Sequence, residues 1–215
     1  MFDLHTHTTM SDGDLCLAEL ARRCQDQGYQ GLVISDHCDH GTVELIVRAA
    51  VLFCEAVGGH YEGLTILPGC EITHVPPDLI GELVQKAREL GARVVLVHGE
   101  TIVEPVKEGT NRAAIEAGAD VVAHPGLIRP EDVARAARKG VRLEITGRQG
   151  HCLTNGYVAR LALEKGALLS FGSDGHEPGD YPDRAMAQRI LCGAGLTPEQ
   201  AEEVLRHNAR LFSGA

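Results

Sequence analysis

Short runs of apolar, mostly β-branched residues alternate with longer amphipathic segments along the whole chain. The apolar runs predict buried strands, and the segments between them have the 3.6-residue apolar period of helices. Seven strands are expected, at residues 2–5, 31–35, 64–71, 93–98, 119–124, 141–145 and 167–172. Strands that alternate with helices indicate a parallel sheet covered by helices, here in one α/β domain over residues 1–215.

Signals at the segment boundaries agree with this alternation. Pro130 suits the first position of a helix, and Thr197 to Gln200 has the pattern of a capping box. Glycine recurs where a helical segment gives way to a strand, as expected of helix C-termini, at Gly28, Gly91, Gly118, Gly140 and Gly166. The seven units can close into a barrel or lie open as a doubly wound sheet, and the pattern leaves both possible. The lack of a G-x-G-x-x-G or P-loop motif disfavours nucleotide-binding versions of the open sheet.

Composition narrows the classes of protein further. Of the 215 residues 44% are hydrophobic and 23% are charged, as is usual for globular proteins. We expect no membrane span, because no run of 18 apolar residues occurs, and no secretory signal in the first residues. The seven cysteines form no C-x-x-C pair, which favours free thiols in a reducing cytoplasm. The formal net charge of −10 makes nucleic acid an unlikely partner.

Potential metal ligands stand at the end of almost every predicted strand. They are His5, His7, His37, Glu71, His98, His124, Glu144, Asp174 and His176. The carboxyl ends of the strands in a parallel barrel meet on one face, where active sites are found. A single histidine at such a position is more often structural, but its repetition on successive strands predicts a metal centre. Imidazole with carboxylate suits Zn, Mn or Fe, and this many ligands suits two or three divalent metal ions.

The motifs that carry these residues resemble those of the polymerase and histidinol phosphatase (PHP) family. Residues 5–13, HTHTTMSDG, are similar to its H-x-H-T-x-x-S-D-G signature. The later motifs follow in family order at residues 35–37, 69–71, 97–98, 123–125 and 173–176. The resemblance implies a distorted (β/α)7 barrel with the metal site at the C-terminal ends of the strands. It also implies phosphoester hydrolysis through a hydroxide that bridges two metals.

The resemblance further implies three sets of ligands. The first metal would be held by His5, His7, Glu71 and Asp174. Glu71 would bridge to a second metal, completed by His98 and His124. The third would be held by His37, His176 and, as an additional ligand, Asp12. Some family members carry a histidine one residue later, where this chain has Gly13.

Four other residues are predicted to serve the reaction. Asp36 and Asp3 flank ligand histidines and are expected to accept hydrogen bonds that fix imidazole tautomers. Arg148 could bind a substrate phosphate, and His151 could donate a proton to the leaving group. Glu71 and Asp174 would act in catalysis as metal ligands. The acidic loop with Glu100 and Glu104 is assigned only to substrate specificity.

Three functions remain open from the sequence. The first is a phosphatase for a small phosphorylated substrate, such as histidinol phosphate. The second, a nuclease or phosphodiesterase acting on nucleotides or oligonucleotide ends, would require a basic track toward the metals, and the chain offers little of one. The third is a noncatalytic RNA-binding scaffold, because residues 109–114 distantly resemble the RNase P protein subunit. Such scaffolds lack much of the metal set that this chain retains.

Overall fold

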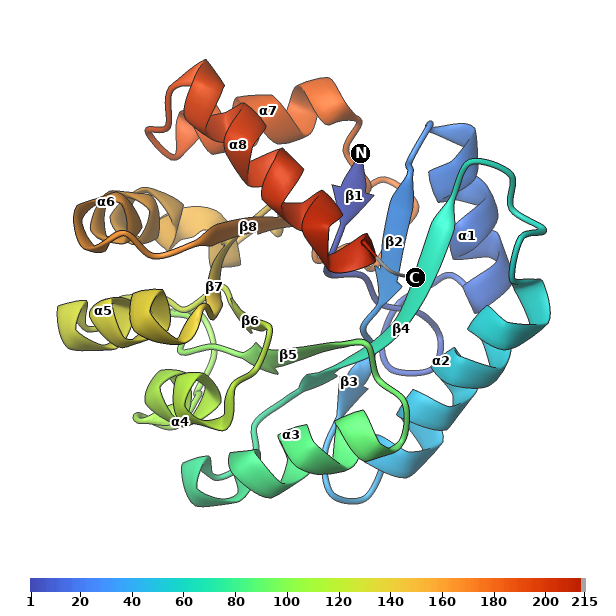
Figure 1. The fold of residues 1–215 in the computed structure, drawn as a ribbon, viewed down its shortest axis with the longest axis horizontal. Helices are drawn as coiled ribbons and strands as arrows, with labels where there is room; N and C mark the ends of the chain where they lie inside the picture. The colour runs from blue at the N-terminus through green and yellow to red at the C-terminus, as the bar shows by residue number, and fades with distance from the viewer. Residues whose placement is uncertain (214–215) are drawn as a thin grey trace.

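The computed structural model describes residues 1–213, which form a ring of strands enclosed by helices (Figure 1). The strands are β1 (Phe2–Asp3), β2 (Gly31–Ile34), β3 (His37–Cys38), β4 (Thr65–Ile72), β5 (Val94–His98), β6 (Val121–Ala123), β7 (Arg142–Thr146) and β8 (Leu169–Gly172). All of their pairings are parallel, in the order β1-β2-β4-β5-β6-β7-β8, and β3 also pairs with β4. The sheet is therefore nearly closed into a barrel of the TIM type.

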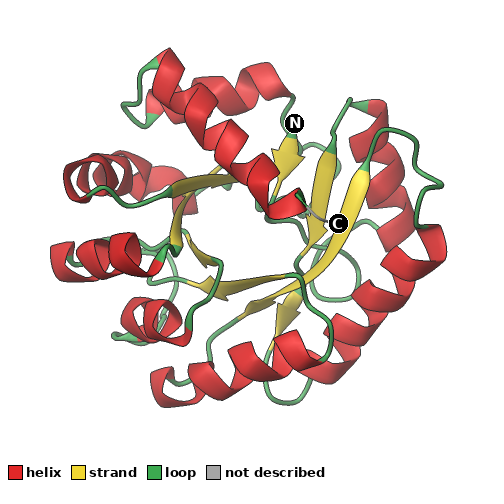
Figure 2. Cartoon of the chain, viewed as in Figure 1, coloured by secondary structure: helices red, strands yellow, loops and turns green. Residues whose placement is uncertain are grey.

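The helices surround the strands (Figure 2). Most of them pack on the strand that precedes or follows them in the sequence, and α8 packs on β8 and β1. They are α1 (Leu17–Asp26), α2 (Val43–Val57), α3 (Ile80–Glu89), α4 (Thr110–Ala117), α5 (Pro130–Lys139), α6 (Asn155–Lys165), α7 (Arg184–Gly193) and α8 (Pro198–Ala209). Short 3-10 turns add η1 (Pro77–Leu79), η2 (His151–Thr154) and η3 (Arg210–Phe212). None of the helices within residues 1–213 is long and apolar enough to cross a membrane.

The two faces of the strands bury different apolar clusters, as the alternation of side chains along a strand requires. Leu32, Val95 and Val122 belong to the main core between the strands and the helices. Their neighbours on the other face of the strands form a second cluster, made of Leu4, Val33, Leu67, Val94, Leu96, Val121 and Phe212. The end of the chain thus contributes an aromatic ring to the inner cluster.

The β1–β8 seam is where the barrel does not fully close. Beyond the strands, one isolated bridge pairs Thr6 with Gly175. At the other end of the seam, Asn208 of α8 is fully buried, and its side-chain amide donates to the carbonyl oxygens of Phe2 (3.0 Å) and Phe171 (2.7 Å). Its carbonyl oxygen accepts from the Phe171 backbone N–H at 3.3 Å. At this end of the seam, one side chain therefore replaces part of the missing ladder of hydrogen bonds.

The predicted α/β barrel and its seven strands are confirmed, with ends that differ by at most two residues. Pro130 begins α5, Thr197 and Gln200 form a capping box, and the five predicted boundary glycines all have positive φ. The two-residue strand β3 was not predicted. Helix α7 was not predicted either, because its apolar positions do not follow a clear stripe.

Candidate metal centre

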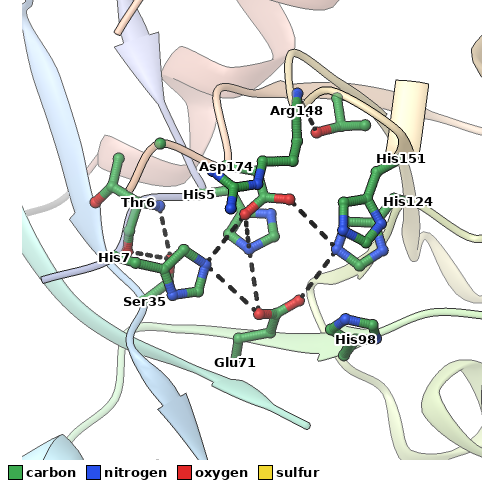
Figure 3. A network of polar contacts seen from close by, with 12 residues as sticks. His5, Thr6, His7, Ser35, Glu71, His98, His124, Arg148, His151 and Asp174 are labelled. Atoms are coloured by element: carbon green, nitrogen blue, oxygen red, sulfur yellow. Dashed lines mark hydrogen bonds and ion pairs between the residues drawn. The ribbon is translucent and has the colours of Figure 1, made fainter. Parts of the chain in front are cut away.

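Histidine and carboxylate side chains gather at the carboxyl ends of the strands, as Figure 3 shows. His5 and His7 follow β1, Glu71 lies in β4, His98 ends β5, and His124 follows β6. Asp174 and His176 come from the turn after β8. Because the strands are parallel, their carboxyl ends lie on the same side of the barrel, and residues as far apart in the sequence as His5 and His176 meet there.

Glu71 lies in the middle of this centre and is fully buried. Its Oε2 atom is 3.3 Å from His5 Nε2 and 3.6 Å from His7 Nε2. Asp174 Oδ1 approaches the same two imidazole nitrogens, at 3.7 Å and 3.3 Å. These four residues are the set that the sequence predicted for a first metal.

The other oxygen of Glu71 faces a second group of imidazoles. Glu71 Oε1 lies 3.6 Å from His124 Nε2, which is also 3.6 Å from Asp174 Oδ2. One ligand atom from each of Glu71, His98 and His124 lies within 4.8 Å of the others. Glu71, His98 and His124 are the residues that would hold a second metal, with Glu71 common to both groups.

A third group surrounds Asp12. Its Oδ1 atom lies 3.2 Å from His176 Nε2, 3.6 Å from His37 Nε2 and 3.9 Å from His7 Nδ1. A side chain at Gly13 would not fit this backbone, because a Cβ atom there would lie 2.6 Å from the carbonyl group of His7. Asp12 is thus the residue that this loop presents to the third group. Its side chain is 54% exposed, so this group is the most open of the three.

The polar atoms of the centre fit divalent metal ions. Buried nitrogen and oxygen atoms in folded proteins nearly always have hydrogen-bond partners. Here His5 Nε2, both ring nitrogens of His7 and Glu71 Oε1 are buried without one, while Glu71 Oε2 lies 2.8 Å from His37 Nδ1. These atoms belong to the same group of side chains, and their types suit Zn, Mn or Fe. Metal coordination explains why such atoms are gathered out of water.

Strong electrostatic coupling follows from this burial. Burial, together with the nearby Glu71 and Glu144, raises the pKa of Asp174 to about 7. Burial alone would lower the pKa of His5, but the surrounding carboxylates, Glu144 first, raise it well above its ordinary value. Burial would likewise raise the pKa of Glu71, yet the imidazoles of His5 and His37 hold it well below its usual range. Without metal, the centre therefore retains protons near neutral pH.

The two aspartates expected to accept from imidazoles have other partners in the structure. Asp36 accepts hydrogen bonds from the Thr8 backbone (2.7 Å) and from the hydroxyls of Thr8 and Ser11. Asp3 accepts from the backbone N–H groups of His5 (3.2 Å) and Ser173 (3.0 Å). Both carboxylates thus fix the backbone that carries the ligands, and act on the imidazoles only indirectly.

Glu144 instead contacts a ligand imidazole directly. Its Oε1 atom lies 2.8 Å from His5 Nδ1, and its Oε2 accepts from the His124 backbone N–H at 3.0 Å. The sequence placed Glu144 among the candidate ligands but did not assign it this contact. Gly172 leaves room for it, since a Cβ atom at that position would lie 2.2 Å from Glu144 Oε1.

The two predicted substrate residues lie in the segment that follows β7, Arg148 in the loop and His151 at the start of η2. Arg148 donates to Asp180 Oδ2 at 3.2 Å and lines a pocket of about 790 Å³ that also includes Ser173, the neighbour of Asp174. His151 is buried beside the metal centre, and its ring stacks on His124 with centroids 4.2 Å apart. Both residues are therefore close to the candidate ligands.

Comparison with known proteins points to one family. A model of the PHP domain matches residues 3–139. A protein of Methanocaldococcus jannaschii, described as uncharacterized, is 40% identical over 207 residues, which are 96% of this chain and 95% of that protein. The DNA polymerase/3'-5' exonuclease PolX of Bacillus subtilis is 25% identical over 131 residues, which are 57% of this chain and 23% of PolX.

A solved structure of archaeal ribonuclease P with mature tRNA contains a chain of similar fold. The TM-score is 0.74 at 14% sequence identity, and the match covers 97% of this chain and 89% of that chain. Identity this low shows a shared fold alone.

Proposed function

The chain belongs to the PHP domain family of metal-dependent, phosphoesterase-type hydrolases, and from this we propose that it hydrolyses a small phosphomonoester. In this proposal the first metal is held by His5, His7, Glu71 and Asp174. The second is held by Glu71, His98 and His124, and the third by Asp12, His37 and His176. Divalent ions bound there lower the pKa of water and neutralise charge on a phosphoryl group, which is the chemistry that the reaction needs.

One observation carries this proposal: Glu71 is shared between two groups of imidazoles, with Oε2 2.8 Å from His37 Nδ1 and 3.3 Å from His5 Nε2, while Oε1 lacks a hydrogen-bond partner. A carboxylate between two metals about 3.5–4 Å apart is the arrangement that serves an in-line displacement at phosphorus. An ordinary buried ion pair would not leave the imidazole nitrogens of His5 and His7 unpartnered as well.

Two side chains beside the proposed metal ligands suit the binding of phosphate and the protonation of the leaving group. Arg148 is half-buried and faces a pocket next to the ligand-bearing turn after β8, which suits a cation that binds a phosphate oxygen. His151 stacks against His124, and its Nδ1 lies 2.8 Å from the hydroxyl of Thr101, which orients the ring. We assign Arg148 to phosphate binding and His151 to protonation of the leaving group.

Phosphate release by the metal-loaded protein tests the proposal. The substrates are histidinol phosphate, a generic aryl phosphate and a 5′-labelled oligonucleotide, each offered with Zn²⁺, Mn²⁺ or Fe²⁺. We expect cleavage of the phosphomonoesters and a loss of at least about a hundredfold in Glu71→Gln. The exposed Glu164→Gln serves as the matched control, because Glu164 pairs only with Arg160 on the surface of α6. Cleavage of the oligonucleotide alone would favour the nuclease, and cleavage of none by any loaded form would refute the proposal.

A further inference from the structure

Glu104 borders the metal centre from the 99–109 loop, between β5 and α4, and faces three imidazoles. Its Oε2 atom lies 3.1 Å from His98 Nε2 and 3.2 Å from His74 Nε2. Its Oε1 atom lies 3.3 Å from His151 Nε2. One ligand atom each from His74, His98 and Glu104 lies within 4.8 Å of the others. The second group of ligands therefore has an acidic neighbour that the family motifs do not include.

The contact of His98 Nδ1 determines which ring nitrogen carries the proton and therefore whether Nε2 has a free lone pair. His98 Nδ1 lies 3.2 Å from the carbonyl oxygen of Gly99, which can only accept, so Nδ1 carries the proton. In the neutral ring Nε2 is then a lone-pair donor, and so is the carboxylate oxygen 3.1 Å away. Two such atoms repel each other unless a proton or a metal ion lies between them. Ligand atoms on one divalent ion, each about 2.1 Å from it, lie roughly 3.0–3.4 Å apart.

We propose that Glu104 is a further ligand of the second metal and binds the same ion as His98 Nε2. The inference rests on the proposed function only in requiring a divalent ion at Glu71, His98 and His124. His74 is a positioning residue in this arrangement, since its Nε2 lies 3.2 Å from Glu104 Oε2.

The backbone around Glu104 is held in place. Both the Gly109 and Asn111 N–H groups donate to Glu100 Oε1, at 3.0 Å and 2.9 Å, and the Asn111 side chain bonds the Glu100 backbone and the carbonyl of Pro125. The end of the loop is thus tied to its beginning and to the turn after β6. Glu104 is therefore presented from a fixed support, as a metal ligand requires.

Backbone strain singles out His74 in the same way as two of the assigned ligands. Within residues 1–213, the residues other than glycine with positive φ are His74 (54°), His124 (26°) and Asp174 (53°). Such conformations are strained and occur where the surrounding structure must aim a side chain. His124 and Asp174 face the metal centre, and His74 faces Glu104. The strain at His74 is accounted for if Glu104 must be held in position.

Metal binding by Glu104→Gln tests the inference without relying on activity. Protein stripped with a chelator is titrated with Mn²⁺ and with Zn²⁺ against a chromophoric chelator, bound metal is counted by mass spectrometry, and Co²⁺ spectra report the coordination number. We expect the wild-type stoichiometry to fall by one weakly held ion, or its affinity to fall at least tenfold. The loss should be larger for Mn²⁺, which prefers oxygen ligands. Glu108→Gln is the control, because Glu108 lies on the same loop and pairs with Arg129 at the surface.

An unchanged or increased metal affinity in Glu104→Gln would have a different meaning. If Glu104 only holds a proton on His98, its removal frees His98 Nε2, and metal affinity stays unchanged or rises in Glu104→Gln. That result would overturn the inference while wild-type metal binding and hydrolysis leave the proposed function intact. If the wild-type protein binds no divalent metal, both the inference and the proposed function are refuted. Partial recovery of affinity in Glu104→Asp would support a ligand role and rule out a folding defect.

Discussion

His5 Nδ1 and Glu144 Oε1 lie 2.8 Å apart, and both side chains are fully buried. The carboxylate fixes the proton on Nδ1, so that Nε2 presents its lone pair toward Glu71 and Asp174. The same carboxylate holds the backbone of His124 through its second oxygen. Glu144 therefore orients ligands of two metals from one position at the end of β7.

Replacing Glu144 by Gln should weaken metal binding without unfolding the protein. The amide can accept from only one of the two N–H groups that Glu144 serves, so either His5 or the His124 backbone loses its partner. We expect the metal affinity to fall about 10–100-fold, measured by competition with a chromophoric chelator. Glu164→Gln again provides the control, and equal affinities for the two variants would contradict this role.

Asp12→Asn should lower the number of bound metals by one. Asp12 is the carboxylate that faces His37 and His176, while the other groups depend on buried acids. Its exposed position gives water access to this group. In the variant, imidazoles and a neutral amide oxygen must compete with water for the ion. Metal counted after dialysis should decrease from three equivalents to two, or the third ion should exchange faster. Retention of all ions with unchanged affinity would show that Asp12 is not a ligand.

Arg148→Met should raise KM for a phosphomonoester more than it lowers kcat. A hydrogen bond to a charged group contributes about 1.5–3 kcal/mol, which corresponds to roughly 10–150-fold in binding. Steady-state kinetics of phosphate release measures the effect. Arg160→Met is the matched control, because Arg160 lies on the exposed face of α6. An unchanged KM would mean that Arg148 serves only to hold Asp180.

Metal binding should release protons at pH 7. The metal-free protein holds protons on Asp174, whose pKa is raised to about 7, and on His5, whose pKa is raised by its carboxylate neighbours. A metal binds the deprotonated ligands only, so its affinity should fall as the pH decreases through 7. Calorimetry in two buffers with different ionisation enthalpies counts the protons released. A binding enthalpy independent of the buffer would contradict this coupling.

Asn208→Ala should destabilise the fold by about 2–4 kcal/mol. The substitution leaves the carbonyl of Phe2 and both backbone groups of Phe171 without the partners that Asn208 supplies at the seam. Urea unfolding with and without metal measures the change. The half-buried Gln25, whose amide donates to the carbonyl oxygen of Glu62 at 3.1 Å, should cost far less when replaced by Ala and sets the scale. A similarly small change in Asn208→Ala would mean that water replaces the side chain at the seam.

The sequence predicted most of the strands and candidate ligands because both follow from local order. A buried run ends, a polar side chain follows, and parallel topology brings His5, His98 and Asp174 together. The contacts it did not predict depend on the folding of irregular segments. The two residues of β3 are too few to show a periodic pattern. Glu104 reaches His98 only because the 99–109 loop turns back over the strand ends.

The seam between β1 and β8 also determines when the metal centre can exist during synthesis. Asp174 and His176 emerge from the ribosome almost 170 residues after His5 and His7, and Asn208 of α8 emerges later still. Until Asp174 and His176 are in place, the first and the third group of ligands each lack one member. Metal bound across the seam would join the segment after β1 to the turn after β8, so that its binding would stabilise the closed barrel over an open one.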